Sequence, residues 1–128
     1  MSDAPRSPGE QFARALAAKD FDGVGQSLDP DVDFRGLTPN RSWEATSSGE
    51  VTREILPAWL EESDHVEELL SLEISDFADR ETMSYSMRGY NDNGPFVVEQ
   101  QAYFITEGDR IVWMRVLCSG FRPDDSAS

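Results

Sequence analysis

The sequence predicts one α+β domain in which short helices pack into a strongly curved antiparallel sheet. Two stretches, 11–28 and 51–60, carry apolar residues at helical spacing. From Val66 onward, apolar and polar residues alternate with a period of two, which is typical of strands. The length of 128 residues fits a single core of ordinary size. Helices followed by an uninterrupted run of strands define the α+β class.

The first half of the chain predicts three helices, one strand and a long loop. Lys19 and Asp20 interrupt the first periodic stretch, which indicates two short helices joined by a turn. Residues 32–37 alternate as a short strand, and the polar stretch 38–49 around Trp43 is interpreted as a loop of unusual length. Pro57 lies inside the next helical stretch, so we expect a kink or an early end there.

The second half predicts an antiparallel meander of four strands over 66–77, 82–90, 96–106 and 110–121. Asn93 with Gly94 and Gly108 with Asp109 are strong hairpin signals between them. Residues 1–9 and 122–128 lack apolar anchors and are expected to be disordered tails, which leaves 10–121 as the domain.

Both faces of this predicted sheet are partly apolar. In the third of these strands, Val97 and Ile105 alternate with Val98 and Phe104, so each face carries apolar side chains. A sheet with one face in water would alternate cleanly between apolar and polar residues. One set of short helices covers only one face. We therefore expect a homodimer formed through the other face.

Charge and cysteine content exclude several classes of function. The net charge of −14 repels phosphate backbones and anionic lipid, so neither nucleic acid nor a membrane surface is an expected partner. The lone Cys118 forms no intrachain disulfide, and no cysteine and histidine cluster predicts a metal site. No cofactor is expected. The start of the chain has no signal-peptide pattern, which makes a cytoplasmic location the expectation.

Three stretches of the chain carry a resemblance to a known family. These are residues 15–24 (ALAAKDFDGV), 28–34 (LDPDVDF) and 109–117 (DRIVWMRVL). Together with the order of elements they resemble the nuclear transport factor 2-like (NTF2-like) superfamily, which includes SnoaL-like cyclases and ketosteroid isomerase, over about residues 10–121. The resemblance implies a cystatin-like cone, or α+β barrel, whose sheet wraps a pocket against the helices.

The catalytic residues of these relatives do not carry over. The tyrosine of ketosteroid isomerase falls on Phe12, its base on about Gly36 and its neutral aspartate on about Gln101. Residues 114–118 hold no acid for a SnoaL-like cyclase, and residues 97–101 lack the Asp-Arg-Asp set of limonene epoxide hydrolases. The resemblance therefore implies a fold and a pocket, and it excludes the ketosteroid isomerase mechanism.

Glu99, Gln101 and Tyr103 are the predicted catalytic residues, because spacing of two places them on one strand face. If Tyr103 projects into the cone, so do the other two. Glu99 is then the expected base, and Gln101 with Tyr103 the donors to a substrate oxygen. The alternative is that Glu99 lies in water and that Gln101 only satisfies a buried partner.

The predicted ligand-binding residues are aromatic or apolar. Trp43 and Trp59 are expected to form an aromatic lid over a flat ligand, although core packing also accounts for Trp59. Cys118 has no visible base and also fits plain core, and His65 lies in an acidic run that favours a solvated surface position. The full ligand-binding set is Phe12, Trp43, Trp59, Met114, Val116 and Cys118.

These observations favour a small-molecule pocket protein of the SnoaL-like kind. The predicted ligand is flat and apolar, like a polyketide, steroid or terpenoid. The predicted chemistry is cofactor-independent isomerisation, cyclisation or dehydration by acid–base catalysis. The alternative is a non-catalytic ligand-binding or dimeric assembly module of the same fold.

Overall fold

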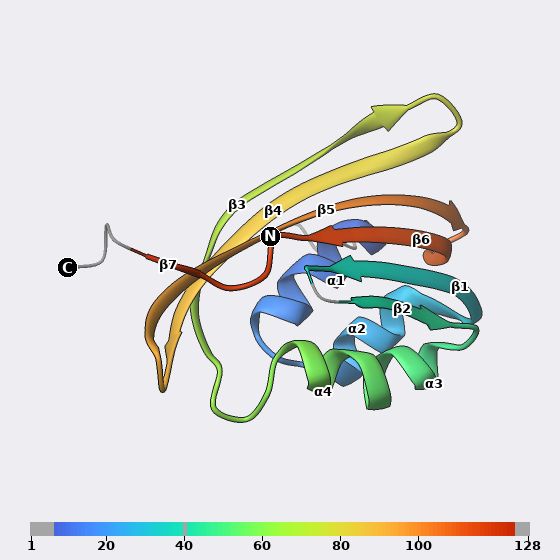
Figure 1. Cartoon of the computed structure of the whole chain (residues 1–128). Coiled ribbons are helices and arrows are strands. Elements are labelled where there is room, and N and C mark those ends of the chain that lie inside the picture. The colour runs from blue at the N-terminus through green and yellow to red at the C-terminus, as the bar shows by residue number, and fades with distance from the viewer. Residues whose placement is uncertain (1–6, 40, 125–128) are drawn as a thin grey trace, which may run out of the picture.

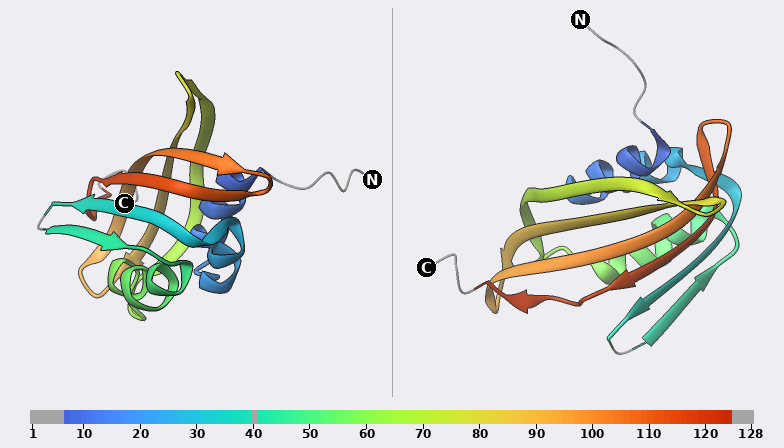
Figure 2. Two further views of the ribbon diagram at one scale, coloured as in Figure 1. Left: turned by 90° about the vertical axis from the view of Figure 1, so that its right-hand side faces the viewer. Right: turned by 90° about the horizontal axis from the view of Figure 1, so that it is seen from above.

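The computed structural model describes residues 7–39 and 41–124 as one curved sheet with helices against one of its faces (Figures 1 and 2). Six of the seven strands lie in the order β2-β1-β6-β5-β4-β3, and the seventh, β7, pairs with part of β5. We call the face that packs against the helices the inner face and the opposite one the outer face. No helix in the described ranges is long and apolar enough to span a membrane.

Two short antiparallel helices begin the described chain, as predicted. Helix α1 (Pro8–Ala17) starts inside the expected tail, because the Ser7 side chain accepts a hydrogen bond from the Glu10 N–H and caps it. Helix α2 (Phe21–Ser27) is capped by Asp20. The apolar side chains of both helices, Phe12 and Leu16 among them, are buried against the sheet.

The third helical segment contains Pro57 and has a π-helical turn just before it. It consists of α3 (Ser48–Glu50), the π-helical turn η1 (Val51–Ile55) and α4 (Leu56–Trp59). The Leu56 N–H donates to the Val51 carbonyl five residues back, whereas an α-helix bonds residues four apart. The helix is therefore irregular just before Pro57, which has no N–H to continue the α-helical bonds. The segment continues past Pro57 to Trp59, so it does not end at the proline, and the irregularity there is the π-helical turn.

A hydrogen-bonded cap starts this segment. Ser47 caps the N-terminus, and the Glu50 carboxylate accepts hydrogen bonds from the Thr46 N–H and hydroxyl. These bonds lower the pKa of Glu50.

The prediction of a long loop at residues 38–49 is wrong, because the middle of this stretch forms a strand. Strand β1 (Leu28–Thr38) turns back into β2 (Arg41–Ala45), with Gly36 opposite Trp43. As an edge strand, β2 exposes polar side chains such as Arg41, Ser42 and Glu44, so the sequence shows no alternation there. Trp43 therefore lies on a strand.

The predicted meander is confirmed as β3 (His65–Phe77), β4 (Arg80–Asn91), β5 (Gly94–Glu107) and β6 (Arg110–Cys118). Two details differ from the prediction. Strand β1 runs parallel to β6, so the sheet is mixed, and it does not close into a barrel. Residues expected to be tail form β7 (Arg122–Pro123), which pairs with Phe96 and Val97. The remaining tail residues, 1–6 and 125–128, lie outside the described ranges.

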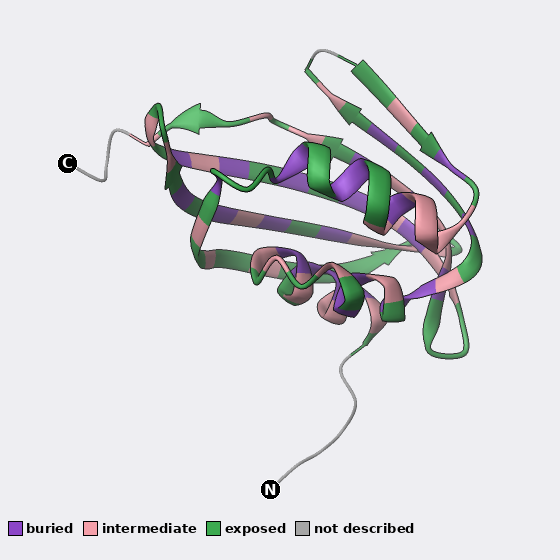
Figure 3. Cartoon of the chain, turned by 90° about the horizontal axis from the view of Figure 1, so that it is seen from below, coloured by how far each residue is buried: buried purple, intermediate pink, exposed green. Residues whose placement is uncertain are grey.

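The hydrophobic core lies between the helices and the inner face, where buried and exposed positions alternate along the strands (Figure 3). On β5 the buried positions are Phe96, Val98, Gln100, Ala102 and Phe104, while Glu99 and Gln101 between them are exposed. The even-numbered residues of this strand therefore face the helices.

Neighbouring aromatic residues on β5 test this assignment of faces. Phe104→Ala removes a fully buried ring and is expected to lower the free energy of unfolding by about 3–5 kcal/mol. Tyr103→Ala removes a partly exposed ring and should cost less than about 1.5 kcal/mol. Urea denaturation of both variants measures the difference, and equal losses would contradict the assignment.

Candidate functional site

A cavity of about 460 Å³ lies between the inner face and the helices. Its walls come from α1, α4, the β1–β2 hairpin, β4, β5 and the segment that follows β6. The described lining residues are Leu16, Thr38, Pro39, Trp43, Ala58, Trp59, Leu60, Met87, Val98, Gln100, Cys118, Ser119, Gly120 and Phe121. A space of this size suits a small organic molecule.

Two tryptophans form an aromatic wall of the cavity. The Trp43 and Trp59 rings meet nearly at right angles, at 83°, with centroids 6.4 Å apart. Trp59 also packs on Phe34, and Gly36 makes room for it, since a Cβ there would lie 2.7 Å from Trp59 Cζ2. The Trp43 indole N–H donates to Thr38 Oγ1 at 3.0 Å. The two rings are therefore held in place by neighbouring strands and by one hydrogen bond.

One polar side chain projects into this apolar space from β5. Gln100 is 6% exposed, and its Oε1 accepts a hydrogen bond from the Tyr85 hydroxyl on the neighbouring strand. Burial raises the pKa of the Tyr85 phenol well above its ordinary value, and Cys118 adds to the rise, so the phenol stays protonated and donates. No described residue accepts from Gln100 Nε2, and this atom is not enclosed by protein. The amide N–H groups are therefore free donors at the cavity surface.

The described lining carries no carboxylate, imidazole, ammonium or guanidinium group. Its ionisable member is the Cys118 thiol, and Tyr85 lies just behind Gln100. Across the described ranges, no three residues of the His, Cys, Asp and Glu types gather closely enough to hold a metal ion. This wall can bind apolar surface and one hydrogen-bond acceptor.

The predicted ligand-binding residues divide into two groups. Trp43, Trp59 and Cys118 line the cavity. Phe12, Met114 and Val116 are buried in the core without reaching the cavity surface, because neighbouring side chains cover them. His65 is exposed and its ring stacks on Tyr90 with centroids 4.8 Å apart, which places it on the surface, as expected.

The expectation that Glu99, Gln101 and Tyr103 project into the cone is wrong. They do share one face of β5, but it is the outer face, because Val98, Gln100 and Ala102 take the inner one. Glu99 pairs with Arg122, and Gln101 Nε2 lies 3.3 Å from the Tyr103 hydroxyl. Glu99 and Gln101 border a second depression together with Ser84, Ser86 and Leu117, and Tyr85, Gln100 and Cys118 line it as well.

The sequence interpretation missed Gln100 and Tyr85. The signal was present, because Tyr85 stands between Met83 and Met87 at spacing two, and Gln100 stands between Val98 and Ala102. A polar residue at a position flanked by buried apolar ones marks a buried polar site. The chosen glutamine was one residue away from it.

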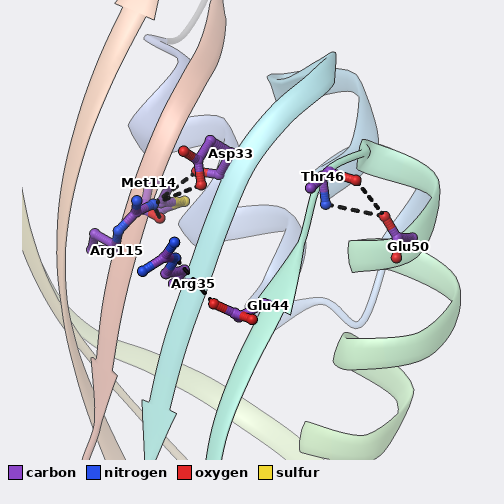
Figure 4. A network of polar contacts seen from close by, with 7 residues as sticks. All are labelled: Asp33, Arg35, Glu44, Thr46, Glu50, Met114 and Arg115. Carbon is purple, nitrogen blue, oxygen red and sulfur yellow. Dashed lines mark hydrogen bonds and ion pairs between the residues drawn. The ribbon is translucent and has the colours of Figure 1, made fainter.

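The outer face carries apolar side chains among charges that are paired. Leu37 and Leu117 are neighbours on β1 and β6, and they are 54% and 56% exposed. Arg35 pairs with Glu44, and Arg115 pairs with Asp33 (Figure 4). Three more arginines at this face are also paired, namely Arg80 with Asp79, Arg88 with Glu68 and Arg122 with Glu99. This face is therefore close to neutral in a strongly acidic chain.

Comparison with known proteins places this architecture among the NTF2-like folds. An NTF2-like protein from Burkholderia thailandensis is 15% identical, covers 89% of this chain and 92% of its own, and superposes with a TM-score of 0.63. A hypothetical protein with a ketosteroid isomerase-like fold from Catenulispora acidiphila, solved with trimethylamine, is 17% identical over 91% and 87%, with a TM-score of 0.65. An LEH-like epoxide hydrolase from M. tuberculosis is 15% identical over 88% and 80%, with a TM-score of 0.62.

The chain has the NTF2-like α+β cone fold. No family model and no curated protein sequence matches it. At such low identity the solved structures define the fold alone, so function has to be argued from the cavity.

The contact between Gly36 and Trp59 gives a test of the aromatic wall. Gly36→Ala places a methyl group against the indole and should displace it, at a cost of about 1–3 kcal/mol in unfolding free energy and with a change in tryptophan emission. Asp31→Ala, at an exposed position of the same strand, is the control and should change stability by less than about 0.5 kcal/mol. An unchanged emission spectrum in Gly36→Ala would refute the packing described here.

Proposed function

We propose that this protein binds an uncharged, flat and largely apolar small molecule, of polyketide, steroid or terpenoid type, in the cavity. The observation that carries the proposal is the combination of two fixed indoles with a described lining that holds no charged group. Aromatic walls bury flat apolar surface well. An ionised ligand would lose hydration there without gaining a counter-charge.

A protonated amine is the competing ligand class, because one structural neighbour was solved with trimethylamine. The Trp43 and Trp59 rings would offer cation–π contacts to such a group. No described lining residue supplies a carboxylate beside them, and a buried cation needs one. The cavity chemistry therefore favours the neutral ligand.

Gln100 is proposed to hold an oxygen atom of the ligand. Its N–H groups are unpaired donors in an apolar wall formed in part by Leu16, Met87 and Val98. The hydrogen bond from Tyr85 fixes the amide oxygen of Gln100, so the N–H groups of this amide point away from Tyr85. Tyr85 is therefore a positioning residue. A ligand with a carbonyl oxygen fits this donor better than a pure hydrocarbon does.

Binding without turnover is favoured over acid–base catalysis. Isomerisation or cyclisation needs a base within reach of the substrate, and no described lining residue carries a carboxylate or imidazole. Glu99, the base expected from the sequence, lies on the outer face. Gln100, oriented by Tyr85, would serve as an oxygen-stabilising donor if a base were supplied by the ligand itself.

Fluorenone and fluorene test the ligand class, because they share one flat skeleton and differ by a carbonyl group. Both should bind the full-length protein, with fluorenone tighter by about three- to tenfold, as expected for one hydrogen bond. Infrared spectra of bound fluorenone should show a lowered carbonyl stretch. Gln100→Met should bring the affinity ratio to about one and remove the shift.

Gln101→Met is the matched control, since it alters the neighbouring amide on the outer face and should preserve both the ratio and the shift. Equal binding of the two probes by wild type, with an unshifted carbonyl, would overturn the role of Gln100 while leaving the cavity as a binding site. Absence of binding by both probes would overturn the proposed function.

Two copies of the chain are proposed to pair through the outer face. Each copy carries a net charge of −14, so two copies repel except where their surfaces are close to neutral. The outer face meets this condition over β1 and β6, where Arg35 and Arg115 are paired, and it also exposes Leu37 and Leu117. Aromatic residues and arginine, represented here by Tyr103, Trp113 and Arg115, are common in interface centres.

Light scattering at micromolar concentration tests the pairing. Wild type should show twice the chain mass of 14.3 kDa, and Leu117→Glu should shift it to a single chain because a buried unpaired charge is costly. Ile74→Glu adds the same charge at an exposed apolar position on β3, opposite the inward-facing Met83, and should leave the dimer intact. A wild-type mass of one chain contradicts the proposal.

A further inference from the structure

The segment that follows β6 forms part of the cavity wall. We call residues 119–124 the C-terminal strap. Strand β6 ends at Cys118, opposite Gln100 of β5, and the strap continues along the same side of β5, where it pairs as β7. Ser119, Gly120 and Phe121 of the strap line the cavity beside Thr38 and Pro39. The strap and the β1–β2 turn therefore meet at one side of the cavity.

The strap is attached to β5 by few interactions. The Ser119 N–H donates to the Glu99 carbonyl at 2.8 Å, and the Glu99 N–H donates to Ser119 Oγ at 2.9 Å. Beyond these bonds, the Asp124 N–H donates to the Pro95 carbonyl at 3.2 Å, β7 has only two residues, and the Phe121 ring packs on Phe96 with centroids 4.5 Å apart. The other strand segments of the cavity wall belong to ladders of five or more paired residues.

Gly120 gives the strap a point of rotation. Its φ is +75°, which an L side chain rarely adopts, and a Cβ there would lie 2.8 Å from Pro39 Cγ. The glycine thus permits both the turn and the close approach to the β1–β2 hairpin. Rotation about Gly120 would move the later part of the strap, from Phe121 onward, away from Pro39.

An ion pair on the outer face holds the part of the strap that follows Gly120. Arg122 of the strap pairs with the Glu99 carboxylate, and the two side chains are 53% and 57% exposed. Glu99 thus holds the strap through its backbone and its side chain. A solvent-exposed pair of this kind is weak and breaks readily.

We propose that the C-terminal strap is the gate of the cavity and that the Glu99–Arg122 ion pair is its latch. The inference rests on the proposed function, because a gate has meaning only if the cavity takes up a ligand. Lifting Phe121 and β7 away from β5 about Gly120 opens the wall that has the fewest attachments. The outer-face position of Glu99 then gains a role, in which this residue controls access without touching the ligand.

Stopped-flow fluorescence with the neutral probe N-phenyl-1-naphthylamine tests the gate. Glu99→Gln and Arg122→Gln should each raise the association and dissociation rate constants together by about two- to fivefold, while Kd changes by less than about twofold. Adding salt should accelerate exchange in wild type and have little effect in Glu99→Gln. The charge-swapped double variant, Glu99→Arg with Arg122→Glu, should restore slow association and dissociation of the probe.

Arg88→Gln is the matched control, because it breaks another exposed outer-face pair, with Glu68, away from the strap. It should leave both rate constants unchanged. Unaltered rates in Glu99→Gln, or a rise in the dissociation rate alone, would overturn the gate while probe binding upholds the proposed function. If wild type does not bind the probe at all, the gate and the proposed function both fail.

Discussion

Burial of the inner face of the curved sheet under short helices is the interaction on which the rest of the structure depends. Helices α1 and α2 have only 10 and 7 residues, and the third segment changes to a π-helical turn before Pro57. Elements this short fill one end of the concave surface and leave the other end open. The cavity is thus a consequence of how the core is covered, and helix residues such as Leu16 and Trp59 line it together with the strands.

The chemistry of the cavity follows from which side chains share that inner face. Because strand periodicity sends the charged residues of β5 outward, the described wall retains indole rings, aliphatic groups, hydroxyl and thiol groups and one amide. The Tyr85 hydroxyl satisfies the amide oxygen of Gln100, so this amide is tolerated there. The acidity of the chain belongs to the exposed surface and sets how copies approach each other. It contributes little to recognition inside the cavity.

The fold was largely predictable from the sequence, and the site was predictable only in part. The change in apolar period from helical to two, together with Asn93-Gly94 and Gly108-Asp109, identified the helices and the meander. Strand β2 was missed because an edge strand of polar residues has no alternation, and the parallel pairing of β1 with β6 is a long-range contact that no local pattern encodes. Alternation located Glu99, Gln101 and Tyr103 on one face correctly. It could not say which face the helices cover, since both faces are partly apolar. That choice is made by packing, and it places Gln100 inside.

The central claim is that a flat neutral molecule lies against Trp43 and Trp59 with its polar end toward Gln100. Nuclear magnetic resonance of the full chain with bound fluorenone measures this most directly. The account predicts intermolecular nuclear Overhauser effects from fluorenone protons to the indole protons of both tryptophans and to Val98. Contacts confined to outer-face side chains such as Tyr103 and Leu117, with none to the indoles, would contradict it.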